Sequence, residues 1–253
     1  MQRELVERIE RAALWAWPPR ETAHVDGWLL RAGSPGGRTR RVDSARTLAF
    51  AAGADVGKAI GRVDAWYATR GLPACFQLTE LSAPTGLDAE LEARGYVRLP
   101  SVSVLLLDAA AVEPPAESLR IELLTRPTPQ VMNAVCDSRW DAATRRTRAE
   151  LFTRIRRPHV FAVLLEGTEP AAGGLCVVDG DLAGIFTLRT YVPFRGRGHA
   201  RAVLRRLVAW ACHAGAREIY LQVEDDNAPA QALHRPLGAE RVYRYWYREA
   251  AGS

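Results

Sequence analysis

The chain has 253 residues, of which 48% are hydrophobic, and it carries a formal net charge of +5 at pH 7. This composition predicts a soluble globular protein of one large or two modest domains, either a monomer or a homodimer. No apolar run approaches membrane-spanning length and the charged N-terminus is unlike a signal peptide, so we expect a cytoplasmic protein without a membrane partner. The positive charge suits anionic ligands, but no nucleic-acid motif or unbroken basic run accompanies it, so we expect no nucleic-acid partner.

Four cysteines are too widely spaced for a zinc site, and no histidine cluster accompanies them. They are Cys75, Cys136, Cys176 and Cys212. We interpret them as reduced and mostly buried thiols, and we expect no metal. The alternative, a nucleophilic cysteine, lacks an activating partner close in sequence.

Helix and strand patterns alternate along the first 112 residues. They predict a helix over 1–17, strands over 27–32 and 40–50, a helix over 56–70, a strand over 74–80, a helix over 87–94 and a strand over 101–107. The turn-rich segment 33–37 is expected to join the first two strands as a hairpin.

Residues 108–118 have the composition of a linker, with Pro114 and Pro115 among small and acidic residues. We therefore place a first domain at 1–112, a linker at 113–118 and a second domain at 119–253.

The same alternation recurs beyond the linker. It predicts a strand over 119–124, helices over 127–140 and 142–155, strands over 159–166, 171–179 and 182–192, a helix over 200–214, a strand over 218–223, a helix over 228–237 and a strand over 241–248.

The two halves align at an offset of 144 residues, which pairs Trp66 with Trp210 and Gly71 with Gly215. We infer two copies of one helix, strand, helix, strand unit. Residues 195–200 align with 51–56, which lack the paired glycines and the arginines of the second copy. If residues 195–200 bind a phosphate group, only the second copy does so, and the first copy is then a packing partner or part of the acceptor site.

A strand, a glycine-bearing turn and a helix meet at Arg195-Gly196-Arg197-Gly198-His199-Ala200. The first turn of a helix has free N–H groups and the positive end of the helix dipole, which suits a phosphate group. Glycine lets the backbone approach a ligand closely. This pattern predicts a pyrophosphate site, with an ordinary strand-to-helix connection as the alternative.

This motif resembles the hallmark of the GNAT superfamily, the acyl-CoA-dependent N-acetyltransferases. A second family block is matched at Asn227, Ala230, Leu233 and Gly238. The resemblance implies an α/β fold, or α+β in some schemes, with two GNAT-like units. Each unit is expected to have a mixed, mostly antiparallel central sheet flanked by helices, and the first unit is degenerate.

The resemblance also implies that acetyl-CoA is the co-substrate. Backbone groups of Leu188 and Thr190 would hold its pantetheine arm, and Asn227 and Ala230 would lie beside it. The pyrophosphate would be bound by amides at Gly196, Arg197, Gly198, His199 and Ala200, with Arg195 beside them.

Two candidate catalytic residues follow from the same comparison. His234 stands where the family usually has a tyrosine that protonates the departing thiolate, so it is either the general acid or a space-filling residue beside the pantetheine arm. Glu224 is the candidate general base, although the acidic run 224–226 also suits a helix N-terminus. Tyr191, Tyr243 and Tyr245 are alternatives. Pro236 should end or kink the last helix.

We therefore predict acetyl transfer from acetyl-CoA to a primary amine of a small molecule or peptide, by direct attack in a ternary complex. The alternative is a catalytically weak acyl-CoA-binding regulatory or scaffold protein. A nucleotide-binding protein is disfavoured because the P-loop and dinucleotide motifs are absent from the sequence. The acceptor pocket is expected from 132–157, the last strands and the first half, where arginines favour an acceptor with a carboxylate or phosphate.

Overall fold

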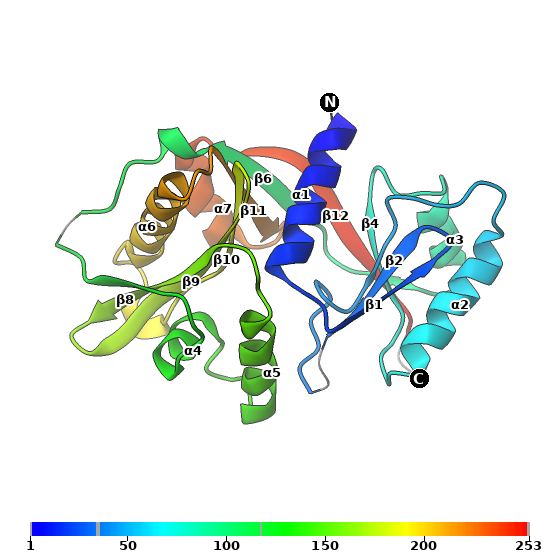
Figure 1. Ribbon diagram of the computed structural model, residues 1–253, viewed down its shortest axis with the longest axis horizontal. Helices are drawn as coiled ribbons and strands as arrows, with labels where there is room; N and C mark the ends of the chain where they lie inside the picture. The colour runs from blue at the N-terminus through cyan, green and yellow to red at the C-terminus, as the bar shows by residue number, and fades with distance from the viewer. Residues whose placement is uncertain (1, 34–35, 117, 252–253) are drawn as a thin grey trace.

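The computed structural model describes residues 2–33, 36–116 and 118–251, which form helices around one long sheet (Figure 1). The helices are α1 (Gln2–Ala16), α2 (Val56–Ala68), α3 (Leu87–Ala93), α4 (Pro129–Val135), α5 (Ala142–Thr153), α6 (His199–His213) and α7 (Ala228–His234). The strands are β1 (Glu21–Val25), β2 (Trp28–Ala32), β3 (Ala45–Arg46), β4 (Cys75–Thr79), β5 (Val97–Arg98), β6 (Val102–Asp108), β7 (Ile121–Leu124), β8 (His159–Glu166), β9 (Glu169–Asp179), β10 (Leu182–Thr190), β11 (Glu218–Glu224) and β12 (Glu240–Glu249).

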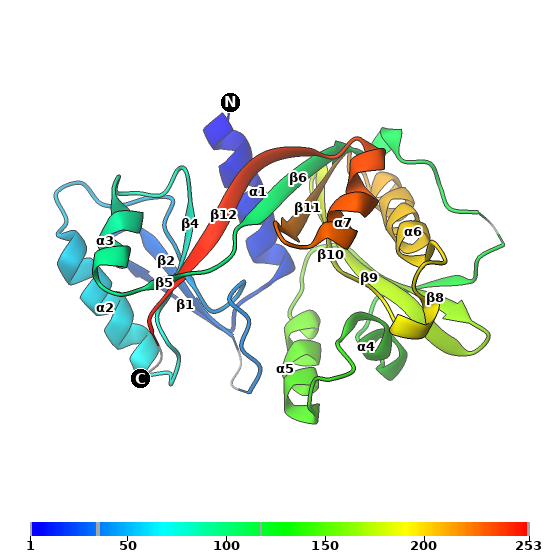
Figure 2. The ribbon, with the colours of Figure 1, turned by 180° about the vertical axis from the view of Figure 1, so that it is seen from behind.

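The sheet runs without interruption through both halves, in the order β1-β2-β3-β4-β12-β6-β11-β10-β9-β8-β7, with β5 beside β12. β6, from the first half of the sequence, lies between β11 and β12 of the second half. β12 pairs with β6 at its start and with β4 at its end, so it crosses from one half to the other (Figure 2). A division of the chain at 113–118 therefore does not divide the sheet.

Helices cover both faces of the sheet in the second half. α6 packs its buried apolar stripe on β8, β9 and β10, while α4 and α1 pack against the opposite face. Because both faces are covered, β8 and β9 are almost continuously buried and hydrophobic. The predicted fold class, a mixed and mostly antiparallel sheet flanked by helices, is confirmed.

The first half has its own core of aromatic and aliphatic side chains beneath α2 and α3. Trp28 and Phe76 pack edge to face there, with ring centroids 5.6 Å apart. Apart from the two-residue strand β5, the elements α2, β4, α3 and β6 repeat the order of α6, β11, α7 and β12. This agreement of order supports the inferred repeat.

A buried polar cluster fixes α1 to the sheet where the two halves meet. Glu10 is only 2% exposed, and its carboxylate accepts hydrogen bonds from Tyr243 (2.7 Å) and from Gln77 (3.0 and 3.2 Å). Arg46 Nε lies 3.2 Å from the same carboxylate. Because these partners come from both halves, the cluster ties the N-terminal helix, β3, β4 and β12 into one unit.

The predicted strand over 40–50 is wrong except at β3. The Asp43 carboxylate accepts hydrogen bonds from the backbone N–H groups of Gly33 (2.6 Å) and Thr39 (2.8 Å), which folds the segment into a loop instead. The hairpin is formed by β1 and β2 across Asp26-Gly27. Sequence analysis missed β1 because all five of its residues are exposed or half-buried. Residues 34 and 35 of the predicted turn lie outside the described residues.

The short strand β5 was also not predicted. The remaining elements occur where the sequence places them, with ends that shift by a few residues. The largest change is α4, which stops at Val135 because Cys136 has an extended backbone. α7 ends at His234 and is followed by a 3₁₀ turn that contains Pro236. This agrees with the break that the missing N–H of Pro236 predicts.

Candidate active site

A gap between strands opens next to the glycine motif. β10 and β11 are parallel neighbours only from Leu182 to Ile185 and from Glu218 to Leu221. On its other edge β11 pairs with β6 along its whole length, and β10 continues to pair with β9. The edge of β10 that faces β11 is therefore free of strand pairing from Phe186 onward.

A β-bulge marks the point where β10 turns away. The register with β9 shifts between Phe186 and Arg189, and Thr187 has a φ of 52°. A positive φ is unfavourable for a β-branched residue, so the surrounding sheet has to hold this conformation in place. The Thr187 hydroxyl is buried without a hydrogen-bond partner. Strain of this kind is typical of functional sites.

The predicted phosphate turn forms the N-terminus of α6. Gly196 and Gly198 have φ values of 76° and 79°, and a Cβ on either glycine would meet no atom within 4 Å. Gly198 is the N-cap of α6 and no side chain caps the helix there. The first N–H groups of a 15-residue helix are thus left to a ligand or to solvent.

The equivalent helix of the first half is capped by the protein itself. The Asp55 carboxylate accepts a hydrogen bond from the backbone N–H of Lys58 (3.0 Å) at the start of α2. A carboxylate there satisfies the groups that an anion would bind. Only α6 of this pair of helices therefore offers uncapped amides.

The side chains of the motif are held in different ways. Arg195 Nε donates to the carbonyl oxygen of Thr190 (3.3 Å), which ties the turn to the end of β10. His199 is buried, and its Nε2 lies 2.8 Å from Glu166 Oε1 without hydrogen-bond geometry. Arg197 lies 4.0 Å from the same carboxylate and over the ring of Phe194, so its charge is partly neutralised.

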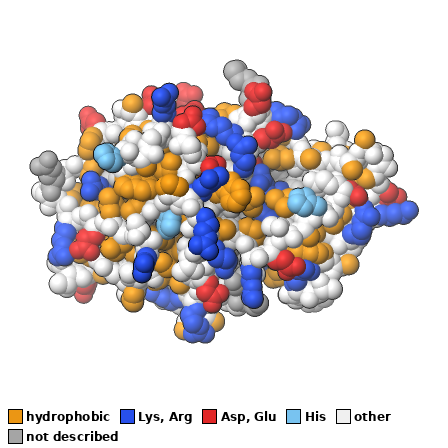
Figure 3. Space-filling model, viewed as in Figure 1, with side chains coloured by type: hydrophobic (Ala, Val, Ile, Leu, Met, Phe, Trp, Pro, Cys, Tyr) orange, Lys and Arg blue, Asp and Glu red, His pale blue; other side chains and the backbone are white. Residues whose placement is uncertain are grey.

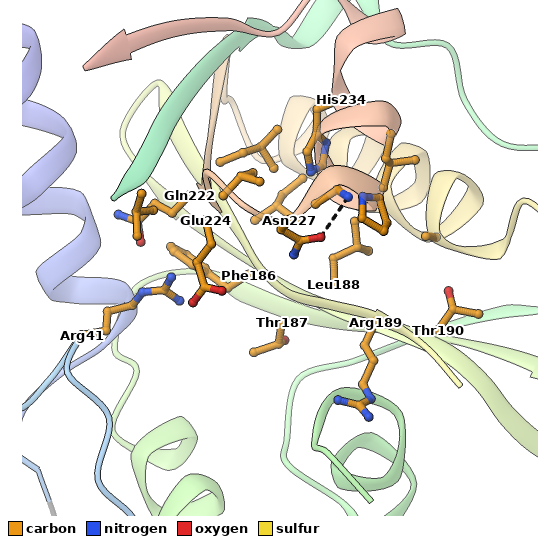
Figure 4. A pocket seen from close by; sticks show the side chains of 18 of the residues that line it. Arg41, Phe186, Thr187, Leu188, Arg189, Thr190, Gln222, Glu224, Asn227 and His234 are labelled. Atoms are coloured by element: carbon orange, nitrogen blue, oxygen red, sulfur yellow. Dashed lines mark hydrogen bonds between the residues drawn. The ribbon is translucent and has the colours of Figure 1, made fainter. Parts of the chain in front are cut away.

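α7 places Asn227 and His234 on the other side of the gap (Figure 4). Asn227 caps α7, and its Oδ1 accepts from the backbone N–H of Ala230 (3.1 Å). His234 is 4% exposed, and its Nδ1 is buried without a hydrogen-bond partner. Burial lowers the pKa of His234 to about 4, so its ring is neutral at neutral pH.

Glu224 lies at the end of β11, and Figure 4 shows its carboxylate turned into the gap. Of the alternative tyrosines, Tyr243 donates to Glu10 in the buried cluster, and Tyr191 donates to the carbonyl oxygen of Cys136 (3.3 Å). Tyr245 lies on the wall of the same cleft as Glu224.

These groups line one cleft of about 1540 Å³. It brings together every predicted site residue except Arg197: Leu188, Thr190, Arg195, Gly196, Gly198, His199, Ala200, Glu224, Asn227, Ala230 and His234. Cleft residues that sequence analysis did not name include Trp17, Arg41 and Gln222. They come from the position just after α1, from the loop before β3 and from β11. Arg148 of α5, also on the wall, belongs to the arginine-rich segment in which an acceptor pocket was predicted.

Among the described residues, neither a metal-binding group nor a membrane-spanning helix is found. Across 2–33, 36–116 and 118–251, no group of three or more His, Cys, Asp or Glu side chains is arranged to hold a metal ion. Within the same ranges, every helix is too short or too polar to cross a membrane.

In comparison with known proteins, the chain matches acetyltransferases. The profile of the family described as "Probable histone acetyltransferase Rv0428c C-terminal" matches residues 5–248. The uncharacterized N-acetyltransferase YobR of Bacillus subtilis is 25% identical over 250 residues, which are 96% of this chain and 98% of that protein. The probable histone acetyltransferase Rv0428c of Mycobacterium tuberculosis is 34% identical over 110 residues, but these are 41% of this chain and 35% of that protein.

Two solved structures show the same fold. A GCN5-related N-acetyltransferase from Kribbella flavida has a TM-score of 0.75 at 17% identity, over 97% of this chain and 95% of the other. A tandem GNAT protein from the clavulanic acid biosynthesis pathway has a TM-score of 0.66 at 15% identity, over 97% and 88%.

Proposed function

Because this chain belongs to the GNAT superfamily, in the family of the Rv0428c C-terminal region, and is an acyltransferase, we propose that it moves an acetyl group from acetyl-CoA to a primary amine. The amine nitrogen forms the new amide bond, the thioester C–S bond breaks, and the proton lost by nitrogen passes to the sulfur or to solvent. The resemblance in sequence and the cleft geometry support this proposal together.

One observation carries the proposal: α6 begins with uncapped amides on an open glycine turn, whereas α2 is capped by Asp55. A diphosphate would complete the hydrogen bonds of the α6 amides and interact with the helix dipole. We therefore assign its binding to Gly196–Ala200 in the second half alone.

The unpaired edge of β10 fits the rest of such a ligand. A pantetheine arm carries amide groups that pair with backbone N–H and C=O groups, as an added strand does. Leu188 and Thr190 lie on this edge, and Asn227 faces it from α7. The Thr190 carbonyl oxygen already accepts from Arg195, so a pantetheine bond there would use its second lone pair.

Acetyl-CoA would supply the activated thioester, and the chain's own groups would supply orientation and proton transfer. Glu224 is the proposed base for the attacking ammonium group, because it is the carboxylate on the cleft wall. Direct attack is favoured over a cysteine acyl-enzyme, since none of the four cysteines lines the cleft. Burial also raises the pKa of the Cys75, Cys136 and Cys176 thiols, which keeps them neutral.

His234 remains the proposed proton donor to the leaving sulfur. Its ring is neutral in the free protein, but negative charge that develops on a nearby sulfur would favour the protonated form. If the ring only fills space beside the pantetheine arm, His234→Ala will turn over at the normal rate.

The direct test is release of free CoA thiol from acetyl-CoA by the full chain in the presence of a panel of primary amines. We expect amine-dependent release with at least one acceptor, and mass spectrometry should identify the N-acetyl product. Saturable acetyl-CoA binding without thiol release across the panel would instead favour the scaffold alternative.

A further inference from the structure

The cleft extends past the phosphate turn toward the junction of the two halves, and there its wall is strongly basic. Among the described residues that line the cleft, seven are arginines and only Glu224 carries a carboxylate. Basic side chains also gather along the middle of the face shown in Figure 3, near α1 and α5. An acceptor that enters here meets a positive surface.

Several of these arginines are already neutralised by the protein. Arg38 and Arg40 share the carboxylate of Glu249, at 2.5 and 2.7 Å. Arg189 lies 3.0 Å from Asp137 Oδ2, and Figure 4 shows its side chain turned toward α4. The charges of these arginines are therefore balanced by the protein and do not require a ligand.

Arg41 and Arg148 differ, because neither has a carboxylate within ion-pair distance in the described part of the chain. Their guanidinium groups lie 5.0 and 4.8 Å from the ring centroid of Trp17. Trp17 is 3% exposed, and its Nε1 and Arg41 Nε are both buried donors without a partner. Arg41 also interacts with the Tyr245 hydroxyl, but its Nε stays without a partner. These three side chains themselves carry hydrogen-bond donors and no acceptor.

Burial also acts on these groups. It lowers the pKa of Arg148 to about 10, which leaves the side chain charged at neutral pH but incompletely compensated. Buried donors without partners are costly, and an arginine fork matches the two oxygens of a carboxylate. A bound carboxylate would satisfy Trp17, Arg41 and Arg148 at once.

Glu224 lies across the cleft from the donors of Arg41. Figure 4 shows the Glu224 carboxylate and the Arg41 guanidinium facing the same space from β11 and from the loop before β3. A molecule that bears both an amine and a carboxylate would place the amine toward Glu224 and the carboxylate toward Arg41.

We propose that the acceptor is a small primary amine that carries a carboxylate, with the carboxylate bound by Arg41, Arg148 and the Trp17 N–H. This inference rests on the acetyl-transfer function proposed above and names its substrate class. A lysine- and arginine-rich histone tail would meet like charge at this wall, which disfavours binding. The family description therefore does not predict the acceptor of this chain.

The test compares matched acceptors with the full chain and acetyl-CoA: the L-amino acids, their carboxamides and a cationic histone-tail peptide. We expect kcat/KM for a preferred acid to exceed that of its amide by roughly 10- to 100-fold, the worth of a charge-assisted hydrogen bond. Arg148→Gln and Arg41→Gln should remove this preference through KM, with acetyl-CoA affinity unchanged.

Arg148→Lys keeps the charge but loses the fork, so it should retain part of the preference. The matched control is Arg146→Gln on the exposed side of the same helix, which should behave as wild type. Equal or better use of the amides or of the histone-tail peptide would overturn the inference while acetyl transfer stands. Absence of thiol release with every acceptor would overturn the transferase proposal with it, so the two failures are distinguishable.

Discussion

Replacing Gly198 with alanine separates the strain of the turn from its role in binding. Gly198 has a φ of 79°, and a Cβ there meets no atom of the protein within 4 Å. The new side chain therefore costs only backbone strain, about 1 kcal/mol after the smaller unfolded-state entropy of alanine is included. For a chain of this size we expect Tm to fall by about 2–4 °C.

Binding should suffer much more than stability. The Cβ would project beside the uncapped amides of α6, where the diphosphate is proposed to lie. Loss of one charge-assisted hydrogen bond, about 1.5–3 kcal/mol, corresponds to a Kd for acetyl-CoA that is weaker by a factor of about 10 to 100. Calorimetric titration of the variant and the wild type measures this factor.

Gly180→Ala is the matched control. Gly180 has a φ of 67° in the turn between β9 and β10, is equally free of contacts and does not line the cleft. It should lose the same stability and keep its affinity for acetyl-CoA. If Gly198→Ala binds as wild type does, or if both variants lose affinity equally, the assignment of the diphosphate to this turn is refuted.

Three further predictions concern catalysis and stability. His234→Ala should lower kcat without changing acetyl-CoA affinity, and His234→Tyr should restore part of the lost kcat. Steady-state kinetics and binding assays measure both quantities. Unchanged kcat in the alanine variant removes this residue from the mechanism. Glu10→Ala leaves buried partners unpaired, so the free energy of unfolding measured in urea should fall by about 3 kcal/mol. The exposed control Glu7→Ala should cost less than about 0.5 kcal/mol. Equal effects would contradict the role of the buried cluster. Burial of Glu249 raises its pKa, but pairing with Arg38 and Arg40 outweighs this and lowers the pKa to about 2. The contribution of the Glu249 carboxylate to stability is therefore present above about pH 4.5 and lost as pH falls toward 2. Chemical denaturation should show a shallower acid loss for Glu249→Gln, and an identical pH dependence would disprove the contribution.

The geometry of the glycine turn at 195–200 could be predicted because all of its parts are contiguous. Residues 188–200 carry the strand end, both glycines and the start of α6, and local sequence dictates each of them. The apolar periodicity of α6 and the apolar runs of β8 and β9 are signals of the same local kind. The absence of a capping residue at Gly198 is also visible in the sequence, as is Asp55 before α2.

The proposed carboxylate site could be predicted only in part: segment 132–157, which contains Arg148, was expected to form the acceptor pocket, but its meeting with Trp17 and Arg41 was not expected. Trp17, Arg41 and Arg148 are separated by more than twenty residues each, and they meet because β6 and β12 continue one sheet through both halves. No local pattern indicates that β6 inserts between β11 and β12. The loop around Asp43 was mistaken for a strand because a side chain, rather than a strand ladder, satisfies its neighbouring backbone groups.

Backbone hydrogen exchange in the presence of acetyl-CoA tests the central claim most directly, because it reports on the very amides that are proposed to bind. We predict that saturating acetyl-CoA slows exchange at Gly196–Ala200 and along the unpaired edge of β10, and leaves the start of α2 unchanged. Unaltered exchange at Gly196–Ala200, or protection that appears at α2 instead, would contradict the account.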